Sequence, residues 1–195
     1  MNTVSILRGA RMAAIAAAAA ASFVAHAGLI GSSVTSQYYA YGGAYTGLGS
    51  PASFVADGTS QQAFCAACAQ GFLLSVTDTQ VIYEFSNNAA WSGSSASLNS
   101  GGLYIDNGNL LSFLGVTIDS VTLDAASTVT GFALSNVTFN SGAIAVSWQN
   151  LGASGQGQKV ILNIGSSGGS VPEPGTFALA GLALMGLAAA RHRKA

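Results

Sequence analysis

The sequence has few charged residues and almost no basic chemistry outside its two ends. Charged residues make up 7% of the 195-residue chain, and both histidines and all four arginines lie within residues 1–27 or 171–195. A nucleophilic serine or cysteine in the region between would have no histidine to activate it, which excludes Ser-His-Asp and Cys-His sites. Nucleic-acid and phosphate binding are disfavoured as well, because Lys159 is the one basic residue of that region.

The region between the two ends also has few residues that could bind a metal. Two cysteines without imidazole are too few ligands for an ordinary zinc site. We therefore expect no metal and no cofactor. Two carboxylates could still meet in space and hydrolyse a glycoside, but no spacing in the sequence singles out a pair. The acidic residues of the central region are Asp57, Asp78, Glu84, Asp106, Asp119 and Asp124, which against Lys159 give a net charge of −5.

Hydrophobic residues of the central region alternate with a period of two, which is the pattern of half-buried strands. The clearest runs are residues 81–85, 144–148 and 160–164. No sustained helical period is present. We predict an all-β fold over residues 28–164, an antiparallel β-sandwich of jelly-roll-like form, with a closed barrel as the alternative. Shorter strand-like runs lie at residues 72–77, 103–106, 110–113, 116–123, 129–134 and 137–139.

Two turn signals predict hairpins. Asn107-Gly108 lies between residues 104–106 and 109–111, and Asn-Gly tolerates the positive φ angles of a type I′ turn. Asn140-Ser141-Gly142 predicts a second hairpin between residues 137–139 and 144–148. The two runs that flank each signal should therefore pair as antiparallel strands.

The N-terminus has the features of a signal peptide. Arg8 and Arg11 precede the apolar stretch 12–24, and Ala25-His26-Ala27 matches the small-x-small pattern of a signal-peptidase site. This pattern predicts a signal peptide over residues 1–27, cleaved between Ala27 and Gly28. An uncleaved membrane anchor is the alternative, although the apolar stretch is short for one.

The C-terminus carries three features in a fixed order. Two prolines hold residues 171–174 in an extended form that cannot join a helix. Residues 177–190 carry no charge, and as a helix they would span about 21 Å of a hydrocarbon core about 30 Å thick. The basic residues 191–194 would remain on the cytoplasmic side. A buried or interfacial helix is the alternative interpretation.

This order resembles the PEP-CTERM sorting signal of Gram-negative bacteria, whose members are processed by a membrane-embedded exosortase. The resemblance covers residues 171–195 and implies a short transmembrane helix and an inner-membrane intermediate. By the same resemblance, trimming would then place the protein at the cell surface or outside the cell. The Gly/Ser-rich residues 165–170 would be a flexible linker to the signal. The implied recognition residues are Val171, Pro172, Glu173 and Pro174.

The two cysteines are spaced as in redox sites, in the segment Cys65-Ala66-Ala67-Cys68. The region has no βαβ pattern, and the chain is directed to an oxidising compartment, so we expect a local disulfide. A redox role, free thiols and intermolecular bridges are the alternatives. A disulfide that closes so short a loop adds little to the stability of the fold, so the bridge would mainly shape a turn.

Tyrosines gather among glycines near the predicted mature N-terminus. Aromatic faces in such a loop can stack on sugar rings, although tyrosines that pack at the rim of a sandwich are the alternative. Trp91 lies in a polar segment and is expected to be exposed, whereas Trp148 lies in a strand and is expected in the core. The candidate glycan contacts are Tyr38, Tyr39, Tyr41 and Trp91.

These features favour an exported, non-catalytic protein of the envelope or extracellular matrix. Its processing partners would be signal peptidase and an exosortase, and the resemblance associates such cargo with exopolysaccharide and biofilm. The alternative is a carbohydrate-binding module that uses exposed Tyr or Trp. An enzyme is a third interpretation with less support.

Overall fold

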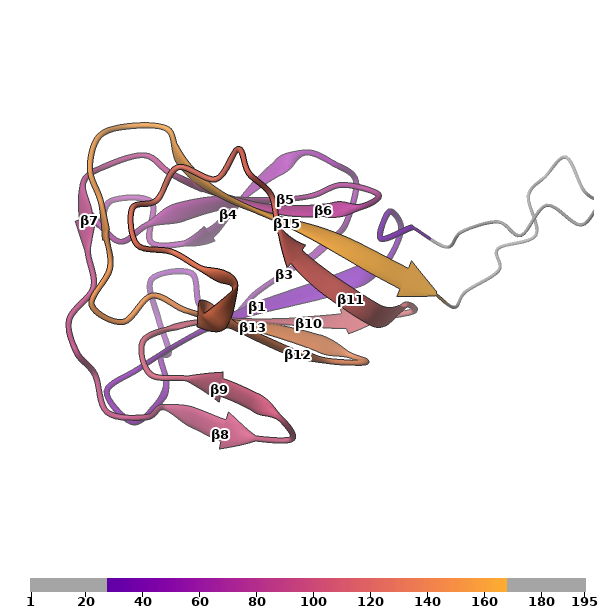
Figure 1. Ribbon diagram of the computed structural model, residues 1–195, viewed down its shortest axis with the longest axis horizontal. Coiled ribbons are helices and arrows are strands. Elements are labelled where there is room, and N and C mark those ends of the chain that lie inside the picture. Colours follow the sequence, from indigo (N-terminus) through magenta and orange to yellow (C-terminus); the bar gives the residue numbers. More distant parts are fainter. Residues whose placement is uncertain (1–27, 168–195) are drawn as a thin grey trace, which may run out of the picture.

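Two antiparallel β-sheets pack face to face in the computed structural model, which describes residues 28–167 (Figure 1). The alternation in the sequence predicts this sandwich, and the structure confirms it. The first sheet has the order β12-β13-β10-β1-β2, with β3 also paired to β1. Its strands are β1 (Ser33–Ala40), β2 (Gly43–Ala44), β3 (Ala52–Val55), β10 (Gly108–Leu114), β12 (Val137–Asn140) and β13 (Ala143–Ser147).

The second sheet has the order β11-β15-β6-β5-β4. Two short pairs and one 3₁₀ turn, η1 (Leu134–Asn136), complete the described elements. The pairs are β7 (Ala89–Ala90) with β14 (Gly152–Ala153) and β8 (Leu98–Ser100) with β9 (Leu103–Ile105). The strands of the second sheet are β4 (Ser60–Phe64), β5 (Phe72–Val76), β6 (Gln80–Phe85), β11 (Thr117–Leu123) and β15 (Gln158–Ser167).

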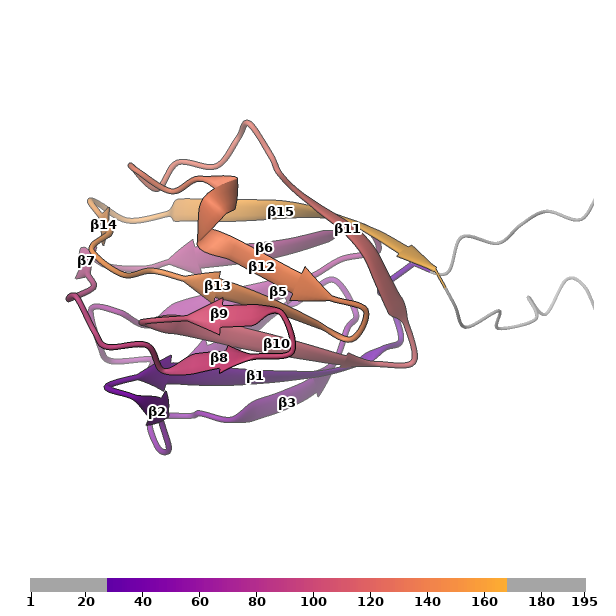
Figure 2. The same ribbon diagram turned by 60° about the horizontal axis from the view of Figure 1, so that its bottom comes forward.

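The core lies between the two sheets and is built from alternate residues of their strands. In β6, Val81, Tyr83 and Phe85 are fully buried, while the residues between them are partly exposed. Strand β13 differs, because all of its residues are buried. The hairpin β8–β9 covers its outer face, where Leu103 and Ile105 form a second small cluster with alanines of β13 (Figure 2).

The Asn107-Gly108 hairpin prediction is wrong. Strand β9 pairs with β8, and β10 pairs with β1 and β13 instead. Gly108 is the first residue of β10, where a Cβ would overlap the backbone carbonyl of Val146. The glycine is therefore needed for the close approach of two strands rather than for a positive φ angle.

The second hairpin prediction is confirmed, because β12 pairs with β13 across Asn140-Ser141-Gly142. The Asn140 side chain accepts a hydrogen bond from the Gly142 backbone N–H at 3.0 Å, which closes the turn. The strand predicted at residues 129–134 is wrong. That segment is a loop in which Gly131 has a φ of +79° and Phe132 packs on Trp148.

The strand registers define two ends of the sandwich. Ser33 pairs with Leu114 and Thr117 pairs with Ser167, so both limits of the described chain lie at one end, which we call the proximal end (Figure 1). The opposite end, the distal end, contains Ala40, Gly108 and the C-terminal ends of β4 and β6. Strand β1 runs from one end to the other, over about 25 Å.

Strand β15 continues to Ser167, three residues past the predicted domain boundary at residue 164. The predicted linker therefore begins inside the sheet. Within residues 28–167 no helix has the length and apolar character needed to cross a membrane. The apolar segment 177–190 lies outside the described residues.

Candidate functional site

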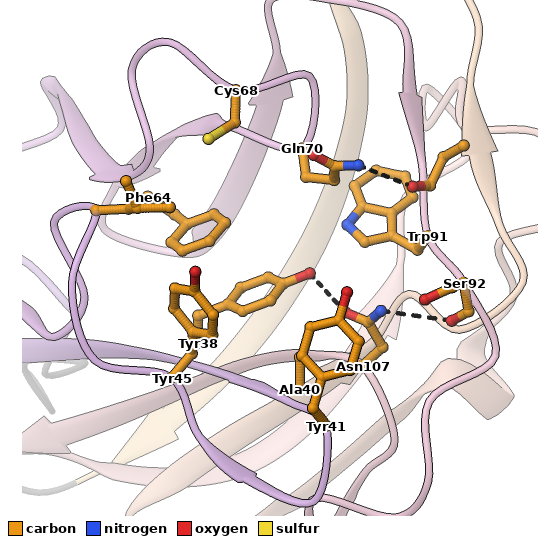
Figure 3. Close-up of a pocket in the computed structure, with 12 residues that line it drawn as sticks. Tyr38, Ala40, Tyr41, Tyr45, Phe64, Cys68, Gln70, Trp91, Ser92 and Asn107 are labelled. Atoms are coloured by element: carbon orange, nitrogen blue, oxygen red, sulfur yellow. Dashed lines mark hydrogen bonds between the residues drawn. The ribbon is translucent and has the colours of Figure 1, made fainter.

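An uncharged cavity of about 250 Å³ opens at the distal end of the sandwich (Figure 3). It lies between the end of β1, the loop after β2, the end of β4 and the segment that follows β7. We call it the aromatic pocket. Its lining residues are Tyr38, Ala40, Tyr41, Tyr45, Leu48, Phe64, Cys68, Gln70, Ala90, Trp91, Ser92 and Asn107.

One wall of the pocket is a stack of rings. The Tyr38 ring lies flat on Phe64, with centroids 4.1 Å apart and an interplanar angle of 4°. Tyr45 meets both rings edge-on, at 6.4 Å from Tyr38 and 6.0 Å from Phe64. Each such pair is worth about 0.5–1.5 kcal/mol beyond its buried area, so the rings hold one another in place.

Trp91 forms the opposite wall. Its ring stacks on Trp148 at 5.6 Å and meets Phe85 edge-on at 5.0 Å. The prediction that Trp91 is exposed is wrong, since its side chain is only 3% exposed. The reason is that the Trp91 backbone N–H donates to the Leu151 carbonyl, which draws this segment over the end of the core. Trp148 is fully buried, as predicted.

Three polar side chains of the pocket, those of Tyr38, Gln70 and Asn107, hydrogen-bond to one another or to the nearby backbone (Figure 3). The Tyr38 hydroxyl donates to Asn107 Oδ1 at 2.6 Å, and Asn107 Nδ2 donates to the Ser92 carbonyl at 3.4 Å. Gln70 Nε2 donates to the Ala90 carbonyl at 3.0 Å. Burial raises the pKa of the Tyr38 hydroxyl, and the nearby Trp91 N–H offsets part of that rise. Tyr38 therefore stays protonated and donating at neutral pH.

Trp91 Nε1 has no hydrogen-bond partner that satisfies ordinary distance and angle criteria. Its N–H points into the pocket, toward the side occupied by Tyr38 (Figure 3). The Trp91 N–H is near enough to the Tyr38 hydroxyl to lower its pKa, but the two groups are not aligned for a hydrogen bond. A buried donor of this kind costs about 1–3 kcal/mol while it is unpaired, so it favours any acceptor that enters the pocket.

The structure brings some of the predicted glycan contacts together and separates one of them. Tyr38, Tyr41 and Trp91 line the pocket. Tyr39 lies next to Tyr38 on β1 and packs against the cluster under the β8–β9 hairpin. The glycines around these tyrosines predict a loop, but Tyr38 and Tyr39 lie in a strand, where adjacent residues face opposite sides.

Nothing in the sequence marks three of the lining residues as part of a binding site. Phe64, Gln70 and Asn107 come from distant parts of the chain, and the Asn-Gly pair at 107–108 indicates a turn rather than a buried side chain. Only the register of β1 with β10 brings Asn107 to Tyr38.

Cys65 and Cys68 form a disulfide, with Cα atoms 5.4 Å apart. Cys68 lines the pocket, and the Cys65 backbone N–H donates to the Leu48 carbonyl at 2.7 Å. The bridged loop thus joins two parts of the pocket wall. Among the described residues, no group of three or more His, Cys, Asp or Glu side chains could hold a metal ion.

Of the predicted processing residues, only Gly28 lies in the described part of the chain. Its Cα is next to the Asp78 carboxylate, because a Cβ at this position would overlap Asp78. The next backbone N–H, that of Leu29, donates to the Asp78 carbonyl at 2.8 Å. Ala27 and the sorting residues Val171, Pro172, Glu173 and Pro174 lie outside the described residues.

Comparison with protein-family models matches residues 170–194 to the PEP-CTERM protein-sorting motif. The match confirms the sorting signal that the order of proline motif, apolar segment and basic end predicts. The chain is therefore a PEP-CTERM domain-containing protein, an exported substrate that is anchored in a membrane and then cleaved by an exosortase. Comparisons with curated proteins and with solved structures gave no significant match.

Proposed function

We propose that the mature domain is a non-catalytic protein of the cell envelope or extracellular matrix that associates with exopolysaccharide. The observation that supports this most strongly is the aromatic pocket. Rings and neutral hydrogen-bonding groups line it, and none of its lining residues is a carboxylate, histidine or amine. Glycoside hydrolysis generally needs two carboxylates across the scissile bond, so the pocket is suited to binding a glycan rather than to cleaving it.

The position of the pocket supports the same proposal. The described chain ends at the proximal end with Ser167, about one strand length away from the pocket. While the tail holds the protein in the membrane, the pocket therefore lies on the far side of the domain. Once an exosortase has removed the anchor, a glycan in the pocket would keep the protein in the matrix.

Charge narrows the choice of polymer. The region 28–171 has a net charge of −5, and Lys159, its one basic residue, lies 3.2 Å from Glu84. Such a domain does not attract anionic polymers or nucleic acid electrostatically. A neutral glycan is the better partner.

The pocket also favours the second candidate function, a carbohydrate-binding module, as the means of this association. The aromatic contacts differ from those that the sequence suggests. Tyr45 and Phe64 join Tyr38, Tyr41 and Trp91, whereas Tyr39 has no part in the pocket.

Cosedimentation tests the proposal directly. Mature protein purified from the producing cells is mixed with exopolysaccharide from the same cells, and both the bound protein and the reducing ends are measured. We expect the protein to sediment with the polymer without releasing reducing ends. A protein that stays in the supernatant would contradict the association, and new reducing ends would contradict the non-catalytic role.

A further inference from the structure

The aromatic pocket is the place where the aromatic core of the sandwich reaches the surface. From Trp148, ring contacts run to Phe85 at 5.3 Å and to Trp91 at 5.6 Å. A second branch joins Phe72 to Phe64 at 6.0 Å, and Phe64 carries Tyr38. The pocket walls are thus extensions of a packed core and keep their shape without a ligand, which lowers the entropic cost of binding.

Among the fully buried side-chain atoms of the described residues, one that lines the pocket has no hydrogen-bond partner. Three buried donors among the described residues lack a partner, and they are Tyr83 Oη, Trp91 Nε1 and Trp148 Nε1. Trp91 is the one of the three that lines the pocket, while Tyr83 and Trp148 are fully buried in the core. Because an indole N–H can only donate, the missing ligand atom is an acceptor.

The size of the pocket limits the ligand to one ring. Its volume of about 250 Å³ is below the roughly 300–1,000 Å³ of pockets that hold drug-sized ligands. Tyr41 is 77% exposed and stands at the rim, where it can contact a ring that sits partly inside. An extended row of sugars would need a groove instead.

The chemistry of the walls limits the charge of the ligand. A carboxylate or phosphate placed in the pocket would lose water and gain no cation, which is costly. A pyranose is neutral, has a C–H face that can lie on an aromatic ring and has oxygens that accept hydrogen bonds. A pyranose therefore suits the absence of charge in the pocket, its aromatic walls and its unpaired indole N–H.

We infer that the pocket between Tyr38, Tyr41, Phe64 and Trp91 binds a single neutral pyranose unit, with Trp91 Nε1 donating a hydrogen bond to one of its oxygens. This inference rests on the proposed association with exopolysaccharide and names the unit of that polymer which is recognised. It further states that charged sugars are excluded. Binding therefore depends on Trp91 and Tyr41 but not on exposed rings elsewhere on the domain.

Competition binding tests the inference. Mature protein is bound to immobilised exopolysaccharide and displaced with free glucose, galactose, mannose or glucuronate, while tryptophan emission is followed in solution. We expect at least one neutral sugar to displace the protein and shift the emission, and glucuronate to be at least tenfold less effective. Trp91→Phe removes the indole donor and should weaken binding about tenfold, the value of one good hydrogen bond.

Two further variants keep the test decisive if Trp91→Phe fails to fold. Tyr41→Asn removes the rim ring at a positive φ angle that asparagine tolerates, and it should weaken binding several-fold. Phe139→Ala removes a ring that is 39% exposed outside the pocket and should leave binding unchanged. Circular dichroism checks the fold of each variant.

The outcomes separate the inference from the proposed function. If folded Tyr41→Asn and Trp91→Phe proteins bind the polymer as wild type does, the association stands and the inference is overturned. Displacement by glucuronate as effective as that by the neutral sugars overturns it too. If wild-type protein does not bind the polymer while a neutral monosaccharide still shifts its tryptophan emission, the proposed association fails. The assignment of the pocket as a site for a neutral pyranose then stands.

Discussion

The two ends of the sandwich share the same strands but differ in backbone geometry. At the proximal end, positive φ angles occur at glycines such as Gly31, Gly58 and Gly115, where they cost little. The four non-glycine residues with positive φ in the described chain are all at the distal end, around the aromatic pocket. They are Tyr41, Leu48, Cys65 and Asn150.

This difference supports the proposed binding role of the distal end. A non-glycine residue in the left-handed region costs about 1–3 kcal/mol and persists where its surroundings fix it. Tyr41 and Leu48 line the pocket, and Cys65 is held by the disulfide beside it. The proximal end instead leads to the sorting signal. We therefore expect substitutions in the sorting signal to affect where the protein goes, and substitutions at the distal end to affect the proposed glycan binding.

The largest expected effect comes from Glu173→Ala in the sorting motif. If an exosortase reads this motif, export should continue while trimming stops, so that a precursor with its C-terminal segment accumulates in the membrane fraction. Cell fractionation with intact-mass analysis measures this. Glu84→Ala, a substitution of the other glutamate, is the matched control and should be trimmed normally. A Glu173→Ala protein with the mass and fraction of wild type would contradict the sorting account.

A pair of glycines gives the next largest contrast. At Gly108 a Cβ would overlap the Val146 backbone, whereas at Gly165 it would overlap the Ser120 hydroxyl, which can rotate away. We expect Gly108→Ala to lower the free energy of unfolding by about 3 kcal/mol and Gly165→Ala by less than about 1 kcal/mol. Urea unfolding of the two mature variants decides the point. Equal losses would mean that β10 and β13 can separate more easily than their packing suggests.

A pair of tyrosines tests the buried hydrogen bond of the pocket. Tyr38→Phe leaves the Asn107 acceptor buried without its donor and should cost about 1.5 kcal/mol. Tyr104 makes an equally short bond to Asp106, at 2.6 Å, but at the surface, so Tyr104→Phe should have no measurable effect. Thermal unfolding of both variants checks the difference. A Tyr38→Phe protein as stable as wild type would show that water replaces the phenol.

The smallest expected effect concerns the new N-terminus. Cleavage after Ala27 would place the ammonium group of Gly28 near the Asp78 carboxylate, since a Cβ at Gly28 would overlap that side chain. An exposed ion pair contributes about 0.2–1 kcal/mol, so Asp78→Asn should lower stability by about 0.5 kcal/mol at low salt and less at high salt. N-terminal sequencing should begin at Gly28. A start at any other residue would remove the basis for this pair.

The fold was largely predictable from the sequence because its buried strands alternate clearly. The alternating apolar residues of 81–85 and 160–164 predict β6 and β15. The polar, Tyr-rich β1 carries a weaker pattern that resembles a loop, and residues 129–134 resemble a strand although Gly131 turns the chain there. Local composition cannot report such tertiary effects.

The candidate site was predictable only in part, for a related reason. Three of its aromatic residues, Tyr38, Tyr41 and Trp91, stand out in the sequence, yet their contacts depend on strand register. Asn107-Gly108 shows most clearly what the sequence cannot decide, because the same dipeptide suits a turn and a close approach of two paired strands. Asn107 becomes a pocket residue only when β10 pairs with β1.

One measurement tests most directly whether the distal end is the binding end. Isotope-labelled mature protein is titrated with the neutral monosaccharide that competes best, and amide and indole resonances are followed by nuclear magnetic resonance. We expect the largest shift at the Trp91 indole N–H, with further shifts at Tyr41 and Tyr45 and none at Ser33 or Leu114. Shifts concentrated at the proximal end, or an indole resonance of Trp91 that does not move, would contradict it.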